Sequence, residues 1–202
     1  MKTRMDLLAW LFITFFLHFC CTPVFVYAYD NKTVHRTINE KAGESSTLGE
    51  YLKTGLGYSD GVEEEFVGKK AWRWLSDGGY EEDEPAPNVR FHFHDPLKEW
   101  GSAGIFEPWS MGMTGSALLR AQSPNYDYTW SKARDSFYTA LTTGSEQAFA
   151  DTFLILGRLT HLVSDMAVPA HVRLDPHLTF DSDWTNFIED PDPYEVPRQR
   201  QV

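Results

Sequence analysis

The sequence of 202 residues has little cysteine and a shortage of basic side chains. Its two cysteines, Cys20 and Cys21, are adjacent and lie in the first apolar stretch, which excludes a disulfide framework. Lysine and arginine number 18 against 29 aspartates and glutamates, and the formal net charge of -11 excludes a chain-wide basic surface for nucleic acid. Apolar residues are not scarce: hydrophobic residues make up 42% and aromatic residues 15%, which excludes a wholly disordered chain.

The first residues have the pattern of an export signal. Basic residues precede an apolar run from Leu7 to Ala28, and Val26-Tyr27-Ala28 ends in a small residue, as cleavage sites do. We therefore expect a signal peptide over residues 1–28 and a secreted or periplasmic domain over residues 29–202. A retained membrane anchor is the alternative, because the apolar run is about long enough to span a bilayer.

Capping residues and apolar stripes predict a mainly α-helical single domain. The expected helices run from Asn31 or Thr33 to Ala42, from Ser46 to about Gly55, from the capping box at Asp60 to Gly78-Gly79, from Trp130 to Thr143, and from Glu146 to about Ala167. The stretch from Tyr80 to about Asn125 is rich in proline and glycine, so we expect loops there. Long loops in a compact domain are usually functional or disordered.

The last predicted helix carries a pair of candidate metal ligands. Its core stripe is expected to be Phe149, Thr152, Phe153, Leu156, Leu159 and Val163, and Pro169 is expected to end it. His161 and Asp165 are four residues apart, so they share a face within reach of one ion. We expect both to be buried, and a buried aspartate is costly unless it is paired or binds a metal. A hydrogen bond that ties two helices together is the alternative.

Other histidines can join this pair. His171 follows Asp165 by six residues across the Pro169 turn, so the segment directs three candidate ligands to one place. Within the loop-rich stretch, Phe91-His92-Phe93-His94 alternates with a period of two, and an extended segment would place both histidines on one side. Once the signal is removed no cysteine remains, so histidine, carboxylate and backbone groups are the ligands available for a transition metal.

Together these motifs resemble the zinc-dependent phospholipase C and single-strand nuclease superfamily. Its signature is an L-G pair, a helix with H-x-x-x-D, a proline, and a histidine six residues past the aspartate. The matching residues are Leu156-Gly157, His161, Asp165, Pro169 and His171. Upstream, DGGYEEDEP with Asp83 resembles the family's glycine-rich helix end, HFHDP with His92 resembles its H-F-x-D-P, and His35 corresponds to its early histidine. The resemblance covers about residues 29 to 190.

The resemblance implies an all-α multi-helix domain around two to three zinc ions. In the family, the residues matching Asp83, His92, His161 and Asp165 hold one ion, and the last carboxylate bridges to a second ion held by the early histidine and the N-terminal amine. Here these would be His35 and Tyr29. The residue matching His171 holds the third ion, for which His177 is the expected partner, completed by Asp181, Glu189 or Glu195 in place of the family's glutamate.

The acidic, histidine and aromatic residues around the expected ligands also have candidate roles. Asp83 would serve as ligand, general base, or both, whereas we expect Glu81, Glu82 and Glu84 to form a solvated turn. We expect His94 to lie behind the ligands or at the surface, because the family has a single ligand there. The aromatic residues of the long loop either line a site for a headgroup or base or pack against the domain; they are Trp100, Phe106, Trp109, Tyr126, Tyr128 and Trp130.

The expected function is that of an exported zinc-dependent phosphoric diester hydrolase of phospholipase C type. Phospholipid or another phosphodiester would be its substrate, a membrane surface is an open further partner, and no stable nucleic-acid complex is expected. Single-strand nuclease chemistry and a noncatalytic module stabilised by metal are the alternatives. The chain ends at Val202, where related domains continue with further helices, so truncation or a partner that covers the core is also expected.

Overall fold

A computed structural model describes residues 31–84, 86–105, 115–174, 178–180 and 187–189. The described α-helices are α2 (Arg36–Ser45), α3 (Leu48–Glu50), α4 (Ala71–Glu81), α5 (Ala117–Gln122), α6 (Trp130–Thr143), α7 (Glu146–Asp165) and α8 (Pro169–Arg173). The single turns are η1 (Asn31–His35), η2 (Tyr51–Gly55), η3 (Gly61–Glu63), η4 (Ala86–Phe91) and η5 (Trp100–Ser102). Two small antiparallel pairs are β1 (Glu65–Phe66) with β2 (Lys69–Lys70), and β3 (Leu178–Phe180) with β4 (Phe187–Glu189). The predicted all-α class is confirmed.

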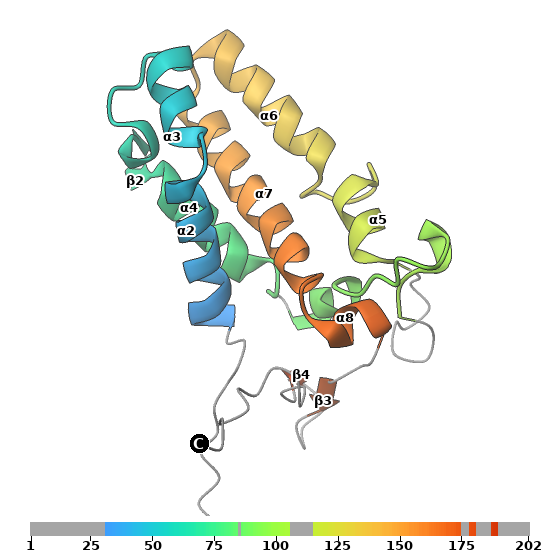
Figure 1. Ribbon diagram of the computed structural model, residues 1–202. Coiled ribbons are helices and arrows are strands. Elements are labelled where there is room, and N and C mark those ends of the chain that lie inside the picture. The colour runs from blue at the N-terminus through green and yellow to red at the C-terminus, as the bar shows by residue number, and fades with distance from the viewer. Residues whose placement is uncertain (1–30, 85, 106–114, 175–177, 181–186, 190–202) are drawn as a thin grey trace, which may run out of the picture.

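Helix α7 is the central element of this arrangement, with α2 and α4 on one side and α6 on the other (Figure 1). Its start is set locally, because the Ser145 hydroxyl accepts a hydrogen bond from the backbone N–H of Ala148. Helix α6 ends at Gly144, which adopts the left-handed conformation with φ of 71°. Both boundaries are as predicted. Pro169 occupies the first turn of α8, so the proline opens a new helix directly after α7.

The hydrophobic core lies where α7 meets the N-terminal half of the chain. Phe66, Phe149 and Phe153 pack together at its centre, with ring centroids 4.8 to 5.6 Å apart. The predicted core stripe of α7 is buried at its first turns, but Val163 is 71% exposed. Including Val163 in the core was therefore wrong, because Val163 lines an open pocket beside α5 and is not packed in the core.

The helix predicted to begin directly after Asp60 begins ten residues later, at Ala71. Asp60 caps no α-helix but a single turn, η3, and residues 65–70 form a tight hairpin. Val67 and Gly68 have φ of 52° and 71°, so both residues of the turn adopt the left-handed conformation that suits a two-residue hairpin loop. The hairpin still places Phe66 in the core, which explains why the apolar spacing looked helical.

Gly78-Gly79 does not end α4, which continues to Glu81. These glycines lie where α4 crosses α7 at close range. A Cβ atom on Gly78 would lie 2.2 Å from the carbonyl oxygen of Leu154, and one on Gly157 would lie 2.2 Å from the carbonyl oxygen of Leu75. Asn39 of α2 links α4 and α7 where they cross, because its Nδ2 donates to the carbonyl oxygens of Leu75 in α4 and Gly157 in α7, each at 2.8 Å.

Helix α5 lies in the stretch that we expected to be loop, and its start is capped by Ser116, whose hydroxyl accepts from the Leu119 N–H. The predicted signal peptide, both cysteines and Tyr29 lie outside the described residues. Among the residues that the structure does describe, none of the helices combines the length and apolar character needed to cross a bilayer.

Candidate metal centre

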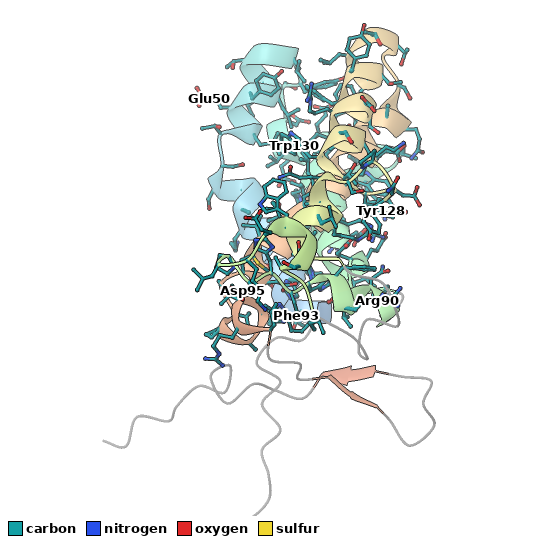
Figure 2. All side chains as sticks on the ribbon, turned by 90° about the vertical axis from the view of Figure 1, so that its right-hand side faces the viewer. Glu50, Arg90, Phe93, Asp95, Tyr128 and Trp130 are labelled. Carbon is teal, nitrogen blue, oxygen red and sulfur yellow. The ribbon has the colours of Figure 1, made fainter. Side chains whose placement is uncertain are left out.

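The predicted ligands from η1, the turn after α4, the loop after η4, and α7 meet at one end of the helical bundle. Figure 2 shows Phe93, which follows His92, toward the lower end of the bundle, and Glu50 toward the opposite end. His35, His92, His161 and Asp165 are all buried, with exposed fractions of 5%, 2%, 0% and 1%. The expectation that His161 and Asp165 are buried is confirmed. The Asp83 side chain is 11% exposed and forms the most open part of the cluster.

The first group of ligands is His35, His161 and Asp165. Nε2 of His35 lies 3.5 Å from Oδ1 of Asp165, and Nε2 of His161 lies 3.2 Å from Oδ2 of the same carboxylate. The two imidazole rings stack, with centroids 3.8 Å apart and planes 24° apart. The three ligand atoms lie within 4.8 Å of one another, so the group could hold a metal ion.

The second group shares His161 and adds Asp83 and His92. Oδ1 of Asp83 lies 3.4 Å from Nε2 of His161 and 3.3 Å from Nδ1 of His92, and the two nitrogens are 3.2 Å apart. Nδ1 of His92 also lies 3.1 Å from Oδ2 of Asp165. Nε2 of His161 can bind only one ion, but Asp165 contacts histidines of both groups through its two oxygens, so ions held there would be close neighbours joined by that carboxylate.

Hydrogen bonds on the far side of two rings fix which nitrogens face the carboxylates. Nδ1 of His161 lies 2.6 Å from the carbonyl oxygen of Gly79, which can only accept, so Nδ1 carries a hydrogen. Ser164 donates its hydroxyl to the His161 carbonyl, so it accepts from Nδ1 of His35 at 3.1 Å. When both rings are neutral, Nε2 of His161 and Nε2 of His35 therefore carry no hydrogen, and each directs a lone pair at the carboxylate of Asp165. Such an arrangement requires a cation between them, either a proton or a metal ion.

Electrostatics of the metal-free cluster agree with this need for a cation. Burial alone would lower the pKa of His161, but the carboxylates of Asp165 and Asp83 raise it well above its ordinary value. Burial would likewise raise the pKa of Asp165 and of Asp83, yet the adjacent His161 lowers both. Burial and the charge of His161 lower the pKa of His35 to about 4, so His35 is neutral and ready to act as a ligand.

The donor set fits a transition metal. Oδ2 of Asp165 is fully buried and makes no contact with hydrogen-bond geometry, although three histidine nitrogens lie within 3.7 Å of it. A buried carboxylate oxygen in that state is expected where a metal ion completes its coordination. Imidazole nitrogen and carboxylate oxygen are the ligands that zinc takes when no thiolate is present.

The third predicted site is only partly described. His171 is buried, its Nδ1 lies 3.7 Å from Oδ2 of Asp165, and its ring packs against Phe93. It belongs to neither of the two groups formed by the described residues. Its predicted partners His177, Asp181 and Glu195 lie outside the described residues, and of Glu189 only the backbone is described, in β4.

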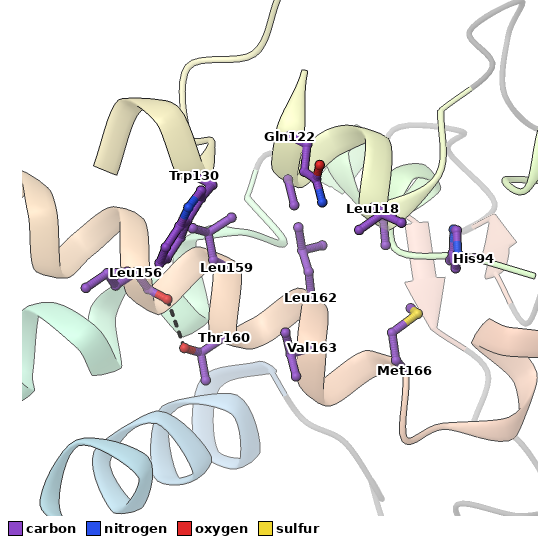
Figure 3. A pocket seen from close by; sticks show the side chains of 12 residues that line it. His94, Leu118, Gln122, Trp130, Leu156, Leu159, Thr160, Leu162, Val163 and Met166 are labelled. Atoms are coloured by element: carbon purple, nitrogen blue, oxygen red, sulfur yellow. Dashed lines mark hydrogen bonds between the residues drawn. The ribbon is translucent and has the colours of Figure 1, made fainter. Parts of the chain in front are cut away.

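His94 does not share the side of His92, so the predicted alternation was wrong. Phe91 ends the turn η4, and His92 enters the cluster after it. The backbone N–H of His94 donates to the carbonyl oxygen of His171. Its side chain lines an open apolar pocket of about 540 Å³ on a different face of α7. Figure 3 shows His94 and Met166 at one end of this pocket and Trp130 at the other.

The acidic run before Asp83 also differs from its prediction. Glu82 is only 1% exposed and lies between two arginines, Arg120 and Arg158, so it is not part of a solvated turn. Glu81 is partly buried and pairs with Arg158, whereas Glu84 is exposed as expected. Sequence reasoning missed these arginines, because neither stands near the acids in the chain.

The aromatic residues of the long stretch have mixed roles. Tyr126 packs edge-on against Phe91, with ring centroids 5.4 Å apart, and the Tyr128 ring lies 3.9 Å from the guanidinium carbon of Arg158. Trp100 and Trp130 are about half exposed, at 50% and 54%. Phe106 and Trp109 lie outside the described residues.

Comparisons of the chain with protein-family models, with curated proteins and with solved structures find no match.

Proposed function

We propose that the protein is an exported zinc-dependent phosphodiester hydrolase of the phospholipase C and nuclease type. The observation that carries this proposal is the pair of buried His/Asp groups whose histidines face the carboxylate of Asp165. A purely structural zinc site needs four ligands around one ion. Here five side chains converge. Asp165 faces His35 with Oδ1 and faces His92 and His161 with Oδ2, so its carboxylate can bridge two adjacent ions as used in phosphodiester hydrolysis.

Adjacent metal ions would supply an activated water at neutral pH and would neutralise the charge that develops on the phosphoryl oxygens. The residues of the chain would hold this arrangement in place. His161 keeps its Nε2 directed at both carboxylates through the hydrogen bond from Nδ1 to Gly79. Asp165 is the only described carboxylate within 3.7 Å of nitrogens from four histidines, which suits a bridging role.

Asp83 is the residue best placed to meet substrate. Its side chain is the least buried of the cluster, and its carboxylate faces His92 and His161 with Oδ1. The charge of His161 keeps the pKa of Asp83 low despite burial, so the carboxylate is ionised at neutral pH. We propose that Asp83 is a ligand and that its outer oxygen accepts a proton from the attacking water.

A noncatalytic module stabilised by metal is the second candidate, and one observation favours it. The other four residues of the two groups are each at most 5% exposed, which suits closed coordination. The two candidates differ in whether a coordination position opens to solvent at Asp83. A closed centre would bind metal and stabilise the fold without hydrolysing any ester.

One preparation can decide between these functions. Metal content of protein purified without chelator should be measured together with cleavage of a phosphocholine ester and of single-stranded DNA. We expect bound zinc and cleavage of the phosphocholine ester, with Asp83→Asn inactive and Glu84→Gln fully active. Cleavage of DNA alone would move the assignment to the nuclease. Zinc without either activity would support the noncatalytic module, and no metal would contradict all three.

A further inference from the structure

The last turn of α4 carries a buried ion-pair network that the proposed reaction does not use. Oε1 of Glu82 accepts a hydrogen bond from Nε of Arg120 in α5 at 3.0 Å, and Oε2 accepts from Nη1 of Arg158 in α7 at 3.1 Å. Arg158 also donates to the backbone carbonyl of Glu81 at 2.7 Å and to its carboxylate at 2.9 Å. The residue that follows Glu82 is Asp83.

This network holds a part of the chain that would otherwise be loose. The last carbonyls of a helix have no partner within the helix, so helix ends fray unless another group binds them. Arg158 supplies that partner for Glu81, and its planar guanidinium fixes direction as well as distance. On α7, Arg158 precedes His161 by three residues, so both lie on one face. One face of α7 therefore binds the end of α4 through Arg158 and contacts Asp83 through His161.

Stability alone explains the network poorly. Arg120 and Arg158 are only 6% and 5% exposed, and the guanidinium of each lies over a tyrosine ring. Bringing such charges out of water is expensive, and well-packed apolar residues often stabilise a fold as well or better. Buried polar networks do hold neighbouring groups in one geometry, and groups behind a metal ligand commonly set its orientation.

We propose that Glu82, held by Arg158 and Arg120, is a positioning residue for Asp83. It fixes the backbone at the end of α4 so that the Asp83 carboxylate meets His92 and His161 at one metal ion. This inference rests on the metal centre of the proposed function. It does not depend on hydrolysis, so it can be tested by metal binding alone.

The test compares Glu82→Gln with Glu84→Gln in the full chain. Glu84 belongs to the same acidic run but is exposed and lies outside the network, so it is a matched control. Metal-free protein would be titrated with cobalt(II), whose visible absorption reports coordination geometry, and then with zinc in competition. For Glu82→Gln we expect one ion to bind about 10- to 100-fold more weakly with a changed absorption spectrum. The other ion and Glu84→Gln should match the parent.

Two lysine variants extend the test if Glu82→Gln does not fold. Arg158→Lys keeps the charge but loses the fork that holds Glu81 and Glu82, whereas Arg120 makes one contact to Glu82 through Nε. We expect Arg158→Lys to weaken binding of the same ion and Arg120→Lys to weaken it less. The thermal unfolding of each metal-free variant separates lost stability from lost positioning.

Unfolding at lower temperature together with the affinity and spectrum of the parent would show a merely structural network and overturn the inference. A parent that binds no metal would overturn the metal centre and this inference with it. A parent that binds metal but cleaves no phosphodiester would overturn the proposed function alone, and the comparison of Glu82 with Glu84 would still decide the present inference.

Discussion

The backbone carbonyl of Gly79 lies 2.6 Å from Nδ1 of His161, although the two residues are 82 positions apart in the chain. This contact requires α4 and α7 to approach more closely than side chains normally allow. The glycines at the crossing permit that approach, since any Cβ atom on Gly78 or Gly157 would collide with the backbone of the other helix. The close glycine crossing thus determines both the packing of α4 against α7 and the orientation of His161.

Gly78→Ala should therefore damage both stability and metal binding. The added methyl group would lie 2.2 Å from the carbonyl oxygen of Leu154, so the helices must separate. We expect a loss of about 1 to 3 kcal/mol or more in the free energy of unfolding, measured by urea denaturation, and weaker zinc binding. Gly101→Ala is the control, because its Cβ would meet nothing within 4 Å, and it should change stability by less than about 0.5 kcal/mol. Equal effects of the two variants would contradict this account.

Substitution of His161 or Asp165 should abolish activity, whereas substitution of His94 in the neighbouring apolar pocket should not. His161→Ala and Asp165→Asn remove groups that face two ligand sets, so each should reduce hydrolysis by more than about 100-fold and abolish tight zinc binding. His94→Ala changes only the apolar pocket and should keep most activity. Circular dichroism must show that each variant is folded. Full activity in Asp165→Asn would rule out the bridging role.

Stability of the metal-free protein should depend on pH with a maximum near pH 6.5. The folded pKa of His35 is lowered to about 4 from 6.5, and that of Asp165 lies below 3.8, so the unfolded chain binds protons more readily at both groups and stability falls as pH drops, first below 6.5 through His35 and then below 3.8 through Asp165. The folded pKa of His161 is raised above 6.5, so its contribution is complete below pH 6.5 and is lost as pH rises through the folded pKa. Urea denaturation across this range measures the curve; a stability that keeps rising above pH 6.5 would contradict it.

Removal of metal should destabilise the protein substantially. A metal ion that binds the folded chain and not the unfolded chain adds stability by mass action, about 4 kcal/mol at a thousandfold excess over the dissociation constant. We expect the melting temperature to fall on addition of EDTA and to recover with zinc, and metal analysis to give two to three ions per chain. Unchanged melting in EDTA, combined with no metal in the purified protein, would refute the metal centre.

Local signals in the sequence predicted α6 and α7 well. Ser145 and Gly144 act through the backbone of their own helices, so their effects can be read from neighbouring residues. The signal at Ser116 is of the same kind and could have revealed α5. At Asp60 the local signal misled, because a hairpin turn at Val67-Gly68 presents Phe66 to the core at a spacing that a helix would also give.

Signals that depend on distant partners were harder to interpret. Gly78-Gly79 has the appearance of a helix stop, yet its purpose is the crossing with α7. Glu82 has the appearance of a surface acid until Arg120 and Arg158 are placed beside it. The sequence brought His161 and Asp165 together by helical spacing alone, whereas His35, Asp83 and His92 were attached to them only through the family resemblance.

The distances along the chain between the candidate ligands have a consequence for the unfolded state. His35 and Asp165 are 130 residues apart, whereas His161 and Asp165 are four apart and Asp83 and His92 are nine apart. An ion held by His35, His161 and Asp165 would act as a cross-link between remote segments. A link that closes a loop of about 100 residues removes roughly 4 to 5 kcal/mol of chain entropy from the unfolded state. The ion would thus supply what a disulfide supplies elsewhere, in a chain whose only cysteines are Cys20 and Cys21.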